Sequence, residues 1–180
     1  RCGWAGGDRG TIWHTEDGGA RWGLQRTEVT CRLESVFFLD SQTGWAAGGS
    51  SHPYLHTSSG VLLATRDGGQ HWNAVPKLLV PALKRVRFFN SKRGWAIGSP
   101  SAMFPSGLFT TDSGGQAWEC VPGPRPVGWL SGGFWDPLNG ALAGRDSQVA
   151  VVQQGVLGPA EVSLPPFRDL ERLKLIGPSY

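Results

Sequence analysis

Residues 33–72 read LESVFFLD, a polar turn, GWAAGG, a loop, VLLATRDGG and a closing Trp72. The same order returns in residues 83–118 as LKRVRFFN, a turn, GWAIG, a loop, LFTTDSGG and a closing Trp118. The second half of the unit also opens the chain, with GWAGG at 3–7 and TIWHTEDGGARW at 11–22, and a weaker copy begins at Trp129. The glycine of the second motif recurs at intervals of 41, 50 and 46 residues, at Gly3, Gly44, Gly94 and Gly140. A period in this range is typical of repeat architectures in which each repeat is one supersecondary unit.

Each repeat carries the patterns of four short β-strands. In the first motif the apolar residues Val36 and Phe38 lie two positions apart, the period that is typical of strands. Gly-Trp-Ala-x-Gly predicts a second strand, with glycine where a neighbouring backbone comes close. Third strands are predicted at 12–15, 62–65 and 108–111, and a fourth strand begins at each closing Trp. Four short antiparallel strands per repeat, in sheets too small to bury their faces alone, predict an all-β protein with the β-propeller fold.

The repeats predict a single domain over 1–180 with about four blades. The predicted units are a partial blade at 1–26, complete blades at 33–76 and 83–121, a degenerate blade at 129–164, and the first strand of a further blade at 170–176. In the degenerate blade, strands are expected at 129–135, 140–144, 147–153 and 160–164. Because the chain opens with Arg1 inside a repeat, we expect it to be a window of a longer protein.

A turn motif, Thr-x-Asp-x-Gly-x-x-Trp, joins the third and fourth strands. Asp can cap a tight turn by accepting hydrogen bonds from backbone amides, Gly supplies a positive φ, and Trp acts as an apolar wedge. The third copy departs from the motif, with Ser113 in the Asp position and Asp112 one place early. The residues assigned to this structural role are Thr15, Asp17, Gly19 and Trp22; Thr65, Asp67, Gly69 and Trp72; and Thr111, Gly115 and Trp118.

This motif resembles the Asp-box of the bacterial neuraminidase repeat, and the fuller pattern over residues 3–145 is similar to the photosystem II stability/assembly factor family and its relatives in non-photosynthetic bacteria. The resemblance implies a larger, usually seven-bladed ring, from which this chain would be an open arc. It also implies that the Asp-box is a structural turn on the face away from the binding site. It further implies a non-enzymatic scaffold that binds another protein, in that family a membrane-protein precursor, in an extracytoplasmic compartment.

Two other functions remain open. Asp-boxes also occur in sialidases and glycosidases, so a hydrolase whose catalytic residues lie outside this window is one alternative, and a sortilin-like receptor ectodomain is another. A sialidase needs an arginine cluster, a Tyr nucleophile and a carboxylic acid/base, but only Tyr54 and Tyr180 are present. Phe167-Arg168 is followed by Asp169-Leu170 and not by the Ile-Pro of the sialidase motif. No complete catalytic site is therefore expected in this chain.

Metal, cofactor, nucleic-acid and membrane functions find little support. His52 and His56 lie four apart in a Ser/Gly/Pro-rich loop without a third ligand, so no metal site is expected. The three cysteines lack metal-ligand spacing and are interpreted as buried or free thiols, with one long-range disulfide as the alternative. The tryptophans recur at the repeat spacing, which favours core wedges over base-stacking platforms. No apolar run approaches the ~20 residues that span a bilayer, and no cofactor is implied.

Two long loops provide the main binding hypothesis. Residues 49–60 and 99–107 join second to third strands and should emerge on the face opposite the Asp-box turns. Together with the neighbouring connection between blades they would group several apolar and aromatic residues, which resemble an interface core with a polar rim. The alternative is that these side chains merely cap the ends of the blades. The residues concerned are His52, Tyr54, His56, Leu78, Leu79, Met103 and Phe104.

A basic stretch provides the second hypothesis. Residues 68–111 contain no Asp or Glu, while Lys77, Lys84, Arg85, Arg87, Lys92 and Arg93 all fall there. The stretch is either a solvated basic edge or a surface for an acidic partner segment. Arg85 and Arg87 lie on a predicted innermost strand, so we expect them to face the neighbouring blade or the central channel.

Overall fold

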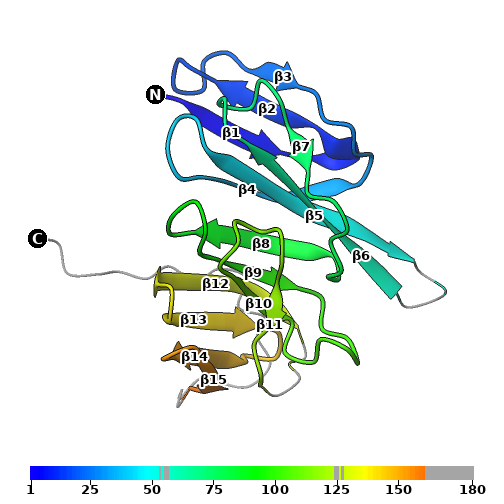
Figure 1. The fold of residues 1–180 in the computed structure, drawn as a ribbon, viewed down its shortest axis with the longest axis vertical. Helices are drawn as coiled ribbons and strands as arrows, with labels where there is room; N and C mark the ends of the chain where they lie inside the picture. The colour runs from blue at the N-terminus through cyan, green and yellow to red at the C-terminus, as the bar shows by residue number, and fades with distance from the viewer. Residues whose placement is uncertain (53, 55–56, 124–125, 127, 161–180) are drawn as a thin grey trace, which may run out of the picture.

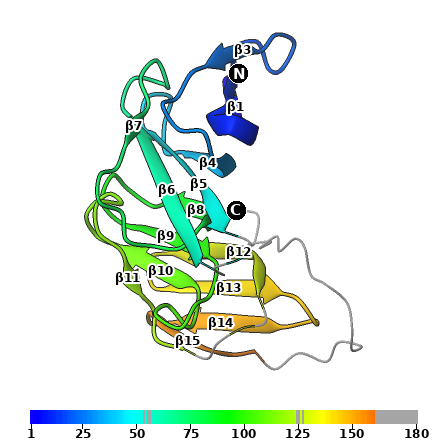
Figure 2. The ribbon, with the colours of Figure 1, turned by 90° about the vertical axis from the view of Figure 1, so that its right-hand side faces the viewer.

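The computed structural model describes residues 1–52, 54, 57–123, 126 and 128–160 and shows an all-β chain (Figure 1). Strands close in sequence form four successive antiparallel sheets, here named blades 1 to 4. Blade 1 contains β1 (Gly3–Gly6), β2 (Ile12–Thr15) and β3 (Gly23–Gln25), with a 3₁₀ turn, η1 (Asp8–Gly10), after β1. Figure 2 shows the blades following one another along a crescent in chain order.

Blades 2 to 4 are four-stranded meanders, which confirms the predicted fold class of four-stranded antiparallel units. Blade 2 contains β4 (Arg32–Phe38), β5 (Gly44–His52), β6 (Thr57–Thr65) and β7 (Asn73–Ala74). Blade 3 contains β8 (Leu83–Phe88), β9 (Gly94–Gly98), β10 (Leu108–Thr111) and β11 (Glu119–Cys120). Blade 4 contains β12 (Trp129–Asp136), β13 (Asn139–Gly144), β14 (Val149–Gln153) and β15 (Val156–Pro159). The first strands β4 and β8 lie against each other, as do β8 and β12.

The hydrophobic core lies between neighbouring blades, because each sheet buries its faces against the next. Ile12 and Leu33 belong to the cluster between blades 1 and 2, Trp45 and Phe88 to that between blades 2 and 3, and Trp129 to that between blades 3 and 4. All five side chains are almost completely buried. The alternation in the first motif is thus explained, since its apolar residues face these interfaces.

At Gly48, the last glycine of its Gly-Trp-Ala-x-Gly motif, a Cβ would clash with the Arg32 backbone carbonyl, as predicted, whereas the first glycine of the motif also makes room for an aromatic ring. A Cβ at Gly44 would lie 2.7 Å from ring atoms of Phe38 in the same blade, and one at Gly94 would lie 2.7 Å from the ring of Phe88. For Gly44 the close neighbour is therefore an aromatic ring and not a backbone. In blades 2 to 4 the Gly and the Phe depend on each other, because the ring needs the space that a side chain would fill.

Two predicted boundaries are wrong. Residues 49–60, expected to form a loop, continue the β5–β6 ladder as far as the pair His52 and Thr57. This extension is supported by tertiary contact, since the backbone N–H of Gly60 donates to the Val80 carbonyl at 2.8 Å. The fourth strand of blade 4, expected at 160–164, is β15 and begins already at Val156. It begins early because Gln154 (φ 53°) and Gly155 (φ 77°) form a two-residue turn directly after β14. The predicted strand 170–176 lies outside the described residues.

Within the described residues, no helix has the length and apolar character needed to cross a bilayer. Cys2, Cys31 and Cys120 are free thiols, so the alternative of a long-range disulfide does not hold. The same part of the chain contains no group of three His, Cys, Asp or Glu side chains arranged to hold a metal ion.

Candidate functional site

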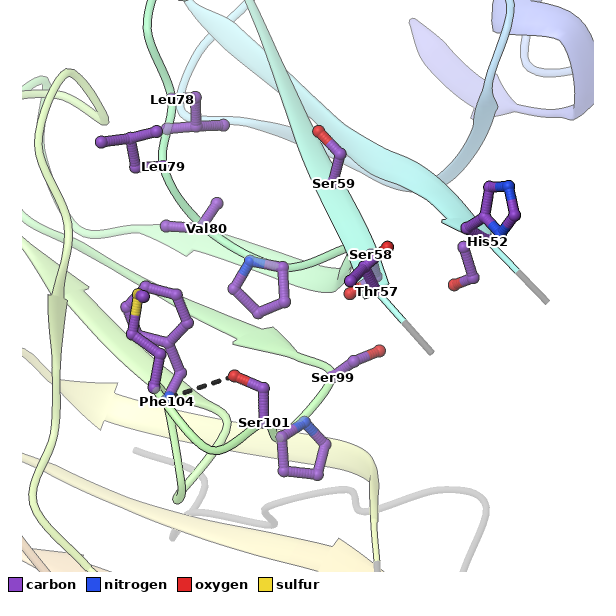
Figure 3. Close-up of a pocket in the computed structure, with 14 residues that line it drawn as sticks. His52, Thr57, Ser58, Ser59, Leu78, Leu79, Val80, Ser99, Ser101 and Phe104 are labelled. Carbon is purple, nitrogen blue, oxygen red and sulfur yellow. Dashed lines mark hydrogen bonds between the residues drawn. The ribbon is translucent and has the colours of Figure 1, made fainter. Parts of the chain in front are cut away.

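A groove of ≈ 610 Å³ opens between blades 2 and 3 at the end where β6 begins (Figure 3). Three segments line it: the end of the β5–β6 hairpin (residues 51–52 and 57–59), the connection from β7 to β8 (residues 78–81), and the β9–β10 loop (residues 99–101, 103 and 104). The groove and the turn after Thr65 lie at opposite ends of β6, a nine-residue strand. A strand of this length spans about 30 Å.

Large apolar side chains stand unusually exposed around this groove. Leu79 and Met103 line it with 85% and 79% of their surface exposed, and Tyr54 in the hairpin tip is 86% exposed. These three are the most exposed large hydrophobic side chains of the described residues. Leu78 and Phe104, which also line the groove, are half-buried and pack against the core between blades 2 and 3. The groove therefore has an apolar floor that joins the core and an apolar rim that faces solvent.

The β9–β10 loop is held in place by hydrogen bonds. The backbone N–H of Phe104 donates to the Ser101 hydroxyl at 3.1 Å, and the Ser101 N–H donates to the Phe104 carbonyl at 3.0 Å (Figure 3). The Phe104 ring meets Phe109 edge to face, with centroids 5.4 Å apart. The completely buried hydroxyl of Ser106 donates to the Val121 carbonyl at 2.6 Å and accepts from the Leu108 N–H at 3.2 Å. Phe104 is consequently presented by a well-anchored loop.

Hydroxyl groups form the opposite wall of the groove. The Ser58 hydroxyl accepts a hydrogen bond from the Ala82 N–H at 3.2 Å, which fastens the connection between blades to the hairpin. The ring of His52 lies 6.1 Å from that of Tyr54 in an edge-on arrangement. None of the residues that line the groove in the described structure is Asp or Glu.

The structure brings most of the predicted binding residues together. His52, Leu78, Leu79, Met103 and Phe104 all line the groove, and Tyr54 lies beside His52. His56 lies outside the described residues. Sequence reasoning missed Ser101, Ser106 and the hydroxyl-bearing residues 57–59, since serine and threonine are common in loops and carry no signal for these contacts.

Arg85 and Arg87 do not line the groove, and both side chains are exposed on β8. One guanidinium N–H of Arg85 donates to the Glu34 carbonyl of blade 2 at 3.4 Å, so this residue does reach the neighbouring blade. Arg87 lies over the Phe89 ring at 5.5 Å from its centroid. Lys84 donates to the Trp129 carbonyl of blade 4 at 3.4 Å, and its burial lowers the pKa of its ammonium group.

In the second Thr-x-Asp turn, the Thr65 hydroxyl donates to Asp67 Oδ1 at 2.8 Å and accepts from the Gly69 N–H at 2.9 Å. The His71 N–H donates to Asp67 Oδ1 at 3.0 Å, and the His71 ring lies 2.7 Å from Oδ2. The His71 backbone N–H, followed by the His71 ring and the Thr65 hydroxyl, lowers the pKa of Asp67 strongly. Gly68 and Gly69 have φ of 72° and 89°, which glycine adopts without strain.

The first and third turns follow the same plan. The Arg21 N–H donates to Asp17 Oδ1 at 2.9 Å, and this bond is the largest cause of the lowered pKa of Asp17. In the third turn, the Ser113 hydroxyl takes the place of the carboxylate and accepts from the Ala117 N–H at 2.9 Å. Thr15 and Thr111 accept from the backbone N–H groups of Gly19 and Gly115, as Thr65 does from Gly69.

The closing tryptophans differ in burial. Trp72 is almost completely buried, and Trp118 is half-buried. They meet Phe38 and Phe88 of their own blades edge to face. Trp22, predicted to be an apolar wedge, is 45% exposed, because the described part of blade 1 has no first strand with an equivalent Phe.

No protein-family model matches the chain, and no curated protein matches it either. Among solved structures, YCF48 bound to a D1 peptide matches with a TM-score of 0.64 and 20% identity, covering 88% of this chain and 50% of that chain. YCF48 from Cyanidioschyzon merolae matches with a TM-score of 0.63 and 20% identity, covering 91% and 53%. An ancestral GH74 enzyme matches with a TM-score of 0.61 and 16% identity, covering 90% and 22%.

The chain thus spans about half the length of the two YCF48 chains that it resembles. At sequence identities of 16–20%, these matches show that the chain shares the fold of these proteins. This chain is part of a β-propeller that resembles YCF48, as its repeat motifs predicted.

Proposed function

We propose that this chain is a non-enzymatic, protein-binding part of a propeller, which captures a segment of another protein in the groove between blades 2 and 3. The observation that supports it best is the exposure of Tyr54, Leu79 and Met103 around one groove. Exposed apolar groups clustered in a concave site favour binding, since association removes them from water. One propeller of similar fold is known with a bound peptide, namely YCF48 with a D1 peptide. The segment captured in the groove could belong to a membrane protein.

The GH74 likeness supports a hydrolase as the second candidate. Most glycosidases need two carboxyl groups about 5 to 10 Å apart around the scissile bond. The described lining of this groove supplies none. A hydrolytic role would therefore need a site outside this groove.

A peptide selection tests the binding proposal. Displayed random peptides of about ten residues are selected on the immobilised wild-type chain, and the enriched peptides are then tested on a Tyr54→Ser, Leu79→Ser, Met103→Ser triple variant. Because all three side chains are largely exposed, the variant should melt like the wild type yet bind at least about tenfold more weakly. Val156→Ser is the matched control, since Val156 is a 66% exposed apolar residue on blade 4.

Failure to enrich any peptide, or equal binding by the triple variant, would contradict the proposal. Release of reducing sugar from an oligosaccharide panel by the purified wild-type chain would favour the hydrolase instead.

A further inference from the structure

The groove lies in a part of the chain that is almost free of carboxylates. Between Asp40 and Asp112 the only acidic residue is Asp67. Its carboxylate is engaged by Thr65 and His71, at the end of β6 opposite the groove. The same stretch holds seven cationic residues, namely Arg66, Lys77, Lys84, Arg85, Arg87, Lys92 and Arg93. Arg66 lies at the far end of β6, Lys92 lies at the turn beside Gly114, and Arg85 and Arg87 do not line the groove. Lys77 alone among these cations directly adjoins a lining residue in sequence.

Lys77 brings one of these cations next to the groove in sequence. It directly precedes Leu78 and Leu79, two of the lining residues, and it is exposed. Its φ of 55° turns the connection between β7 and β8 there, in a conformation that is uncommon for a residue other than glycine. No described carboxylate lies within salt-bridge distance of Lys77. Its charge is thus available to a bound partner.

We infer that the groove prefers an extended segment in which an apolar side chain is flanked by acidic residues. The inference rests on the proposed function and names the chemistry of its partner. An apolar anchor would cover the exposed surfaces of Leu79 and Met103, while a neighbouring carboxylate would meet Lys77 and no fixed negative charge of the lining. A basic flank would meet the Lys77 ammonium group without a counter-charge, so the groove discriminates by repulsion as well as attraction.

Three labelled peptides test this directly. All share a Ser-Leu-Phe-Ser core and differ in having two Glu, two Gln or two Lys residues on each side. Fluorescence anisotropy on the wild-type chain should give affinities in the order Glu, Gln, Lys, with about tenfold between Glu and Lys at about 50 mM salt. The ratio should fall to about twofold at about 0.5 M salt, because the Debye length shrinks well below 10 Å.

Lys77→Glu should abolish or reverse the preference for the Glu peptide. Lys92→Glu is the matched control, because it makes the same charge change at the turn beside Gly114, to whose N–H the Lys92 carbonyl is bonded. In this control the ratio of the affinity for the Glu peptide to that for the Lys peptide should also fall. The fall should be less than about half of that seen with Lys77→Glu.

The outcomes separate the inference from the proposed function. Equal binding of the three peptides overturns the preference for acidic flanks but leaves capture of apolar segments intact. An unchanged preference in Lys77→Glu also overturns the inference, since the charge of Lys77 would then play no part. If peptides enriched in the selection do not bind the isolated wild-type chain in solution, the proposed function itself fails.

Discussion

Trp45 of blade 2 lies flat on Phe88 of blade 3, with ring centroids 3.7 Å apart and ring planes 10° apart. The indole N–H of Trp45 also donates to the Gly114 carbonyl in the turn of blade 3, at 3.1 Å. The arrangement recurs with Trp4 on Phe38 and with Trp95 on Phe134, and these indoles donate to the carbonyls of Gly68 and Pro137. The Trp of each Gly-Trp motif therefore joins its blade to the next one.

Trp45→Ala should lower the free energy of unfolding by about 3–5 kcal/mol, since it removes a large buried aromatic and leaves a cavity between blades. Urea unfolding followed by circular dichroism measures the change. Trp22→Ala is the matched control, and it should cost clearly less because this ring is 45% exposed. Similar unfolding midpoints for the two variants would contradict a special role of the Trp45–Phe88 stack.

Asp67 should make stability depend on pH. Hydrogen bonds from His71 and Thr65 hold the pKa of Asp67 below its usual range. The folded state therefore stabilises the ionised carboxylate of Asp67 relative to the protonated acid. This contribution is present above the unfolded pKa of about 4 and is lost as the pH falls through the lower folded pKa. Asp67→Ala should thus be less stable than the wild type at pH 6, and the gap should narrow towards pH 2.

Thermal melts of the wild type and Asp67→Ala at several pH values test this, with Asp112→Ala as the control. In the described structure, Asp112 accepts none of the hydrogen bonds of its turn, which go to Ser113 and Thr111. A gap of constant size from pH 6 to pH 2 would show that the ionised form of Asp67 is not what stabilises the turn.

Ser113→Asp should stabilise the third turn by about 0.5–1 kcal/mol, because a carboxylate accepts stronger hydrogen bonds than a hydroxyl. The new side chain would accept from the Ala117 N–H and from Thr111, as Asp67 accepts from His71 and Thr65. Chemical denaturation gives the change, and Asp112→Ser should be nearly neutral. A loss of stability in Ser113→Asp would mean that this turn has adapted to the smaller group.

The sequence predicted the strands well where side-chain period and packing agree, as in Val36 and Phe38. It failed in the β5–β6 hairpin, because the serines there give no strand signal and the ladder depends on Gly60 and its contact with Val80. The groove could be anticipated from the repeat, which places Leu79 and Met103 on adjoining blade ends. The burial of Ser106 could not, since it follows from tertiary contacts with Val121.

Ser106 links stability to the proposed binding function. Ser106→Ala removes a completely buried hydroxyl and leaves the Val121 carbonyl and the Leu108 N–H without this partner. The expected cost is about 1–3 kcal/mol. Because the same hydroxyl fixes the end of the loop that carries Met103 and Phe104, peptide affinity should fall as well, even at temperatures where the variant is fully folded.

Ser101→Ala is the control for this coupling. Ser101 is half-buried and its hydroxyl accepts only the Phe104 N–H among the described hydrogen bonds, so its loss should cost about 0.5–1 kcal/mol. Thermal melting and fluorescence anisotropy on the same preparations give the stability and the peptide affinity of each variant. Leu79→Ser should lower peptide affinity and leave the melting temperature unchanged. Ser106→Ala should lower both quantities, and Val156→Ser should change neither. If Ser106→Ala melts like the wild type, the buried hydroxyl does not anchor the loop, and any change in affinity would need another cause.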